Sequence, residues 1–279
     1  MRAYFARRLI LFVPTAFGVS IFIFVMLHTI PGDYATALLI GSPEAQINAS
    51  EEDFERVREQ LGLNGSLPSQ YVHWLGDFFK GDFGTSWTNR RPVLDRMAPR
   101  IMLSLELGIL AVTIACVLGT VGGVIAAVRQ DTWVDYVLRF VSMAFQAMPV
   151  FWMALIVIVV LIALFQWIPP ISYRHIWEDP VRNFQVLFLP ALLVGSRSSA
   201  EILRMTRSSV LEVLREDYVR TAEAKGLRKV HILGVHVLRN ALIPVVTLAG
   251  FEVVFLMSGQ VITEQVFNLP GLGKLFIQA

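Results

Sequence analysis

Cysteine and charge are both scarce in this chain. Its 279 residues contain a single cysteine, Cys116, so no intrachain disulfide can form. Cys116 stands in an apolar run, and we interpret it as a packing residue. Charged residues make up 16% of the sequence and hydrophobic residues 55%, which is more apolar surface than one soluble domain buries. The composition therefore predicts an integral membrane protein.

Signals of nucleic-acid binding, nucleotide binding, metal binding and catalysis are also missing. The basic residues cluster without the interleaved aromatic residues of a nucleic-acid platform. Gly271-Leu-Gly-Lys274 has the wrong glycine spacing for a phosphate-binding loop, and Leu275 stands where that loop needs serine or threonine. His231 and His236 lie five apart in a basic stretch, and no His, Asp or Ser cluster converges. We expect no catalytic residue, no metal site and no cofactor on this chain.

Five apolar runs predict an all-α membrane protein. Residues 1–30 form the first span, because no small-residue cleavage site closes this run, and Arg2, Arg7 and Arg8 place the N-terminus in the cytoplasm. The second run is about 42 Å long as one helix, so it must tilt or protrude. The runs after the first cover residues 101–128, 141–167 with a kink at Pro149, the stretch through 186–194, and 241 to about 262.

Residues 31–98 are polar and predict a folded extracytoplasmic insertion over the outer mouth. A short helical pattern covers residues 51–62. Residues 99–279 form the main helical part, with a cytoplasmic loop at about 204–240 that is rich in arginine and lysine. The aromatic residues of the insertion include Trp74, Phe78, Phe79 and Trp87.

Topology requires the weak fourth span. Arg129 and Arg139 bracket a short basic loop, and because the later basic loop must lie on the same side, one crossing separates them. Arg197 and Glu201 lie four apart on the inner end of that crossing and can pair. Separately, Gly119 and Gly123 form a G-x-x-x-G pair on the second span, which favours close approach of another helix.

The fifth span is expected to begin after Asn240 as N-cap, with Pro244 in its first turn. Residues 266–276 then resemble a turn that leads into another helix, and the sequence ends before that helix could span.

A charged segment precedes the fifth span. The spacing of Ser209 and Glu212 is that of a capping box that could restart a helix, and Asp217 can cap a short helix over 218–225 that Gly226 ends. The small side chains of Ala222 and Ala224 would permit a partner to approach closely. The pattern fits equally a docking helix for another protein and an amphipathic helix lying on the membrane surface.

Polar residues inside the spans are the candidates for a translocation path. Glu252 lies near the middle of the fifth span, Gln260 follows two turns later, and Gln146 lies on the third span. Interhelical hydrogen bonding is the alternative role for each of them. Glu106, near the outer end of the second span, is expected to be structural.

The chain resembles the first permease of the dipeptide, oligopeptide and nickel group of bacterial ATP-binding-cassette importers. It departs from the general permease loop at Arg220-Thr-Ala222, where Glu-Ala-Ala is more usual, and from the family's six helices in lacking the last one. The matching motifs are Pro31-Gly-Asp33, Leu61-Gly-Leu63, Gly81-Asp-Phe-Gly84, Arg91-Pro-Val93, Ser104-Leu-Glu-Leu-Gly108, Arg220-Thr-Ala-Glu-Ala-Lys-Gly226, Arg239-Asn-Ala-Leu-Ile-Pro244 and Pro270-Gly-Leu-Gly273.

The resemblance implies a type I importer permease in the bacterial inner membrane that moves substrate by alternating access. Its expected partners are a second permease subunit, two ATPase subunits that carry ATP and Mg²⁺, an extracytoplasmic substrate-binding protein and membrane lipid. The implied substrates are di- and oligopeptides; nickel chelates, glutathione and oligosaccharides use the same scaffold. A self-sufficient secondary transporter is disfavoured, because the two halves of the chain show no repeat. The implied ATPase-coupling residues are Asp217, Tyr218, Arg220, Thr221, Ala222, Glu223, Ala224, Lys225 and Gly226, supported by Arg239, Asn240 and Pro244.

Overall fold

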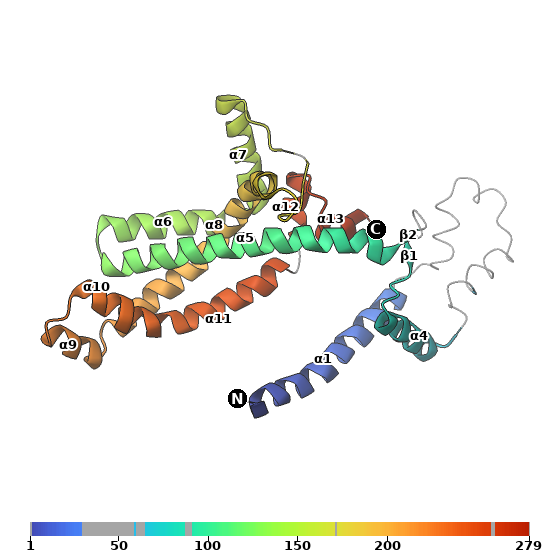
Figure 1. Cartoon of the computed structure of the whole chain (residues 1–279), viewed down its shortest axis with the longest axis horizontal. Coiled ribbons are helices and arrows are strands. Elements are labelled where there is room, and N and C mark those ends of the chain that lie inside the picture. Colours follow the sequence, from blue (N-terminus) through green and yellow to red (C-terminus); the bar gives the residue numbers. More distant parts are fainter. Residues whose placement is uncertain are drawn as a thin grey trace. The chain divides into compact units, whose positions relative to one another are not determined.

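The computed structural model describes residues 2–29, 59, 65–86, 91–170, 172–257 and 260–278, and most of these are helical (Figure 1). The chain divides into two compact units, Met1–Asp95 and Arg96–Ala279. Two motifs of the resemblance, at 31–33 and 61–63, lie outside the described residues, as do Trp87 and almost all of the helix predicted over 51–62.

The first unit is built on α1 (Arg2–Thr29) and α4 (Leu67–Lys80). The two helices meet through aromatic rings and polar side chains: the Phe24 and Tyr71 ring centroids are 5.4 Å apart, and Ser20 Oγ lies 2.7 Å from the Tyr71 hydroxyl. Gly81 ends α4 at a φ of 80°, a conformation that favours glycine. A two-residue antiparallel pair, β1 (Thr85–Ser86) with β2 (Arg91–Pro92), completes the described part of this unit.

The second unit is a bundle of helices. After α5, the chain turns back into α6, and α7 then leaves at a steep angle (Figure 1). The elements are α5 (Val93–Val128), α6 (Trp133–Ala147), α7 (Val150–Phe165), α8 (Pro180–Val213), α9 (Asp217–Ala224), α10 (Lys229–His231), the π-helical segment η1 (Ile232–Val237), α11 (Leu238–Met257), α12 (Val261–Val266) and α13 (Leu272–Gln278).

Among the described residues, four helices are long and apolar enough to span a membrane, and α6 with α7 makes a fifth span if the pair is counted as one. The two helices of this pair are bent by 104° at a break before Val150, so the expected kink at Pro149 is in fact a sharp break. Arg139 lies inside α6, which corrects the predicted loop: the connection after α5 covers only residues 129–132.

Helix α8 forms the centre of the second unit and explains the weak fourth span. Its apolar window has the lowest hydropathy of the four spans, 1.4, and 72% of that window is buried by protein. A helix surrounded by other helices needs fewer apolar residues than one facing lipid. The glycine pair of α5 packs here as expected, because a Cβ at Gly119 would lie 2.6 Å from Ile202 and one at Gly123 2.6 Å from Thr206.

In the loop predicted to be cytoplasmic, at about 204–240, the helix boundaries differ from those expected from the sequence. Helix α8 continues to Val213, so Ser209 and Glu212 do not restart a helix. The chain is helical from Lys229 through η1 into α11, which places Asn240 inside the helix and not at its N-cap. Pro244 is likewise an interior residue, and α11 ends at Met257 instead of near 262.

A buried ion pair ties α6 to α8. The carboxylate of Asp135 is fully buried and accepts two hydrogen bonds from the Arg207 guanidinium, at 2.8 and 2.7 Å. The Asp135 carboxylate also accepts the backbone N–H of Asp131 at 3.1 Å, where the chain turns from α5 into α6. One side chain therefore fixes both the turn and the contact with α8.

A second buried carboxylate joins the end of the chain to α5. Glu264 of α12 is fully buried, accepts a hydrogen bond from Ser104 Oγ at 2.7 Å, and accepts the Lys274 backbone N–H at 2.8 Å. Ser104 Oγ in turn accepts the backbone N–H of Leu272 at 2.9 Å. The first turn of α13 is thus satisfied by groups on two other helices.

Candidate functional site

Helix α9 rests on an apolar cluster that we call the α9 seat. Two residues of α9 enter it, Val219 at 1% and Ala222 at 7% exposure. The other buried members come from α5, α8, η1 and α11, and are Ala127, Val210, Ile232, Val237 and Ala241. The seat therefore connects α9 directly to the ends of the long helices.

A polar contact beside the seat holds α9 against the start of α11. The Asn240 side-chain amide donates to the Tyr218 hydroxyl at 2.8 Å, and the Tyr218 hydroxyl reaches the His236 carbonyl oxygen at 3.4 Å. Asn240 therefore contacts one of the predicted coupling residues directly. Its predicted role as the N-cap of the fifth span is wrong, because it lies inside α11.

The ends of α9 are well defined. Glu216 is the N-cap residue, so Asp217 is the first residue of the helix and not its cap. At the other end Gly226 adopts a φ of 77°, its N–H donates to the Glu223 carbonyl at 2.9 Å, and the Leu227 N–H donates to the Ala222 carbonyl at 3.3 Å. These two bonds form a Schellman motif, in which glycine is the favoured residue.

The face of α9 that points away from the seat is exposed to solvent. Arg220 and Asp217 approach to 3.9 Å, but both are more than two-thirds exposed, so this pair contributes little to stability. Ala222 points into the seat, which corrects its predicted place on the partner-facing surface. The exposed residues of the segment are Asp217, Tyr218, Arg220, Thr221, Glu223, Ala224, Lys225 and Gly226, and Arg239 is exposed nearby.

A cavity of about 540 Å³ lies between α6, α7, α8, α11 and α12. Two of the three predicted path residues, Gln146 and Gln260, line it; Glu252 does not, but it interacts with Ser198, which does. The remaining lining residues are Ala147, Met148, Pro149, Val150, Phe151, Val194, Arg197, Phe255, Leu256, Val261, Ile262 and Thr263.

The three polar candidates differ in how they are satisfied. Gln146 bridges α6 and α8, because its amide donates to Glu201 at 3.1 Å and accepts from Arg204. By contrast, Glu252 Oε2 and Gln260 Oε1 are buried and have no hydrogen-bond partner among the described residues. Gln146 therefore has the interhelical role that was its alternative, whereas the other two retain unused acceptors.

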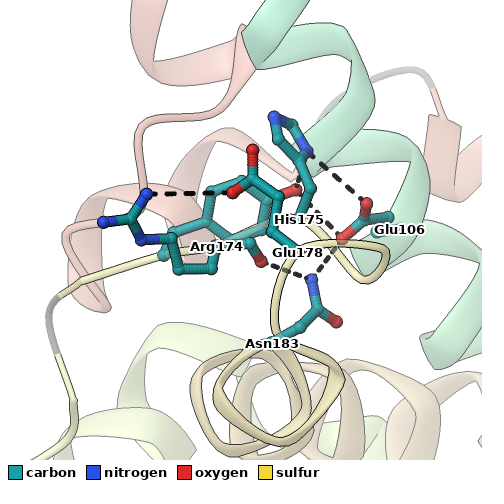
Figure 2. Close-up of polar contacts among 6 residues, drawn as sticks. Glu106, Arg174, His175, Glu178 and Asn183 are labelled. Atoms are coloured by element: carbon teal, nitrogen blue, oxygen red, sulfur yellow. Dashed lines mark hydrogen bonds and ion pairs between the residues drawn. The ribbon is translucent and has the colours of Figure 1, made fainter.

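A polar cluster surrounds Glu106, toward the end of α5 that is remote from the α9 seat (Figure 2). Glu106 accepts hydrogen bonds from the Asn183 amide and from the Tyr173 hydroxyl, the latter at 2.9 Å, and His175 Nδ1 lies 3.7 Å from its carboxylate (Figure 2). Burial, together with the bond to Glu106, raises the pKa of Tyr173, so the phenol remains a donor. These contacts fix the 172–179 connection onto α5 and the start of α8, in agreement with the structural role expected for Glu106.

Several residues that shape these sites had no clear signal in the sequence. Asp135, Arg207, Tyr173 and Asn183 occur in no motif, and Glu264 precedes the Pro270-Gly-Leu-Gly273 stretch without obvious spacing to it. Within the part of the chain that the structure describes, no group of three or more His, Cys, Asp or Glu side chains could hold a metal ion.

Comparison with known proteins agrees with this architecture. Residues 119–279 match the binding-protein-dependent transport system inner membrane component family, and residues 1–108 match the N-terminal region of such membrane components. The chain therefore belongs to the inner-membrane components of binding-protein-dependent transport systems, which confirms the family predicted from the motifs. It is a multi-pass inner-membrane protein that works with a substrate-binding protein and with separate ATPase subunits.

Its relatives include glutathione transport permeases. The chain is 38% identical to the glutathione transport system permease protein GsiC of Escherichia coli strain K12, over the whole chain and 87% of that protein. The protein of the same name from Shigella dysenteriae serotype 1 gives the same identity and coverage.

Proposed function

We propose that this chain forms half of the translocation path of an ATP-driven importer for short peptides, glutathione among them, and works by alternating access. A second permease subunit supplies the other half, and the N-terminus lies in the cytoplasm. The exposed face of α9, with Asp217, Arg220 and Ala224, docks on an ATPase subunit. The names of the relatives support glutathione as the first substrate to test, and the motif pattern supports the wider peptide class.

One observation carries this proposal: α9 is linked to the cavity through the same helices that hold it. Its seat includes Val210 of α8 and Ala241 of α11. The same two helices line the cavity with Ser198 and Leu256. Because packed helices move as rigid bodies, a displacement of α9 by a docked ATPase shifts the cavity walls.

The docking of α9 is tested by Ala224→Trp. Ala224 ends α9 on its exposed side, so the larger side chain leaves the seat intact and obstructs only a partner. We expect at least about tenfold weaker retention of the ATPase subunit, measured by co-purification of the solubilised complex.

The matched control is Val181→Trp. Val181 is 66% exposed and lies at the other end of α8, about 50 Å away along the helix. This variant should retain the ATPase fully. If Ala224→Trp retained the ATPase subunit as fully as Val181→Trp, the exposed face of α9 would not be the docking surface.

Glu252→Gln tests the polar interior of the fifth span. Glu252 is 8% exposed, and glutamine keeps its shape while removing the negative charge. We expect about tenfold slower uptake of lysine-containing dipeptides by reconstituted vesicles, with assembly intact and neutral dipeptides little affected. Glu178→Gln, at an exposed connection, is the control. Unchanged uptake of the cationic peptides would exclude Glu252 from the path.

A further inference from the structure

Arg197 lines the cavity without an ion-pair partner. It is half-buried and stands on α8 three residues after the apolar stretch through 186–194, near the inner end of the predicted crossing. The other described residues that line the cavity are uncharged. It forms no hydrogen bond or ion pair with another described residue, and the predicted pair with Glu201 is absent because Glu201 accepts from Gln146 instead.

An unpaired, half-buried arginine on a membrane helix is unfavourable unless it has a use, since such charges are normally paired or face a polar path. Glu252 is near enough to interact electrostatically with Arg197, although the two form no ion pair. The cation therefore faces a cavity in which no protein carboxylate among the described residues binds it directly.

The rest of the lining suits a small polar molecule with apolar parts. Phe151 and Phe255 supply apolar surface, and Gln260 and Thr263 supply hydrogen-bonding groups. The volume, about 540 Å³, lies within the range of small-ligand sites. A guanidinium presents donors in a planar fork that matches a carboxylate with two parallel hydrogen bonds.

We propose that Arg197 binds a carboxylate of the transported substrate, so that the permease itself selects molecules with a free carboxylate. This inference rests on the proposed function and narrows it: short peptides and related amino-acid derivatives carry a carboxylate that matches the guanidinium fork, whereas uncharged sugars offer it only hydroxyl groups. Arg197 is then a specificity-determining residue of the permease subunit.

Direct binding to the complete importer tests the proposal without involving the substrate-binding protein. The complex of both permeases and both ATPase subunits is purified, and binding is measured for Ala-Ala against Ala-Ala amide, and for glutathione against its diethyl ester. We expect the wild type to bind at least one free acid about tenfold more tightly than its blocked form. Arg197→Gln should abolish this preference, and Arg197→Lys should keep part of it.

Two further measurements separate recognition from a structural role. Removing an unpaired charge from the interior should leave the thermal midpoint of Arg197→Gln unchanged or higher, whereas a structural arginine would lower it. Arg129→Gln, the same change at an exposed position in the connection after α5, should alter neither preference nor midpoint. No preference in the wild type, no binding of either free acid, or a preference that survives Arg197→Gln would overturn the proposal. ATPase docking on α9 would stand in each case, because Ala224→Trp tests it separately.

Discussion

Replacing Asp135 by alanine is expected to lower the stability of the protein by about 3–5 kcal/mol, because it leaves the Arg207 guanidinium without its counter-charge. Asp135 is fully buried, and Arg207 is 19% exposed, so water cannot substitute for the lost carboxylate. The variant also loses the acceptor for the Asp131 N–H at the turn between α5 and α6. The measurement is the thermal midpoint of the solubilised protein, followed by size-exclusion chromatography after heating.

A double variant shows whether the pair or the single charge matters. Asp135→Leu combined with Arg207→Met removes both charges and keeps apolar volume, so most of the lost stability should return. The coupling between the two positions is then the difference between the double variant and the sum of the single ones. A loss below about 1 kcal/mol for Asp135→Ala would show that the pair is not a main tie between α6 and α8.

Hydropathy and the positive-inside rule predicted where the chain is membrane-like, because a helix must satisfy its own backbone in lipid. They could not predict the 104° break before Val150, since a window over residues 141–167 reports only mean composition. The same limit applies at the start of α11. An N-cap at Asn240 was a reasonable local prediction, but the π-helical segment η1 already supplies the preceding turn.

The predicted sites show the same division between local and distant information. The end of α9 at Gly226 could be predicted because the Schellman motif is written in consecutive residues. The inward orientation of Ala222 depends on Val210 and Ile232, which come from other elements, and spacing within α9 does not reveal it. Likewise, the i and i+4 spacing of Arg197 and Glu201 permitted a pair, but Gln146 from another helix binds Glu201 instead.

Motif resemblance identified separate stretches of the chain without showing that they meet. Ser104 and the loop before α13 belong to two separate motifs, and Glu264 belongs to neither. In the structure, Ser104 Oγ accepts the N–H of Leu272 from the second motif, and the Glu264 carboxylate accepts from Ser104 Oγ and from the Lys274 N–H just after that motif. The contact between Ser104 and Glu264 joins residues 160 positions apart, which no local pattern can encode.

This carboxylate leads to the second large prediction, which concerns Gly271. A Cβ built at Gly271 would lie well inside 3.0 Å of the Glu264 carboxylate, closer than real Cβ contacts. Glu264 cannot move aside without breaking its bonds to Ser104 and Lys274, and it is fully buried. Gly271→Ala should therefore cost about 1–3 kcal/mol by overpacking, and more if the carboxylate loses its donors. The thermal midpoint of the solubilised protein measures this loss.

A control variant and a double variant test whether contact with Glu264 causes the loss of stability. Gly250→Ala lies in α11 with nothing within 4 Å of its Cβ, so it should leave the midpoint unchanged or raise it slightly, as alanine favours helix. Glu264→Ala is itself expected to destabilise, since the Lys274 N–H and Ser104 lose their acceptor. In that background the space at residue 271 is free, and adding Gly271→Ala should cost little further. An additive loss in the double variant would mean that the close approach of Glu264 is not the cause of the loss at residue 271.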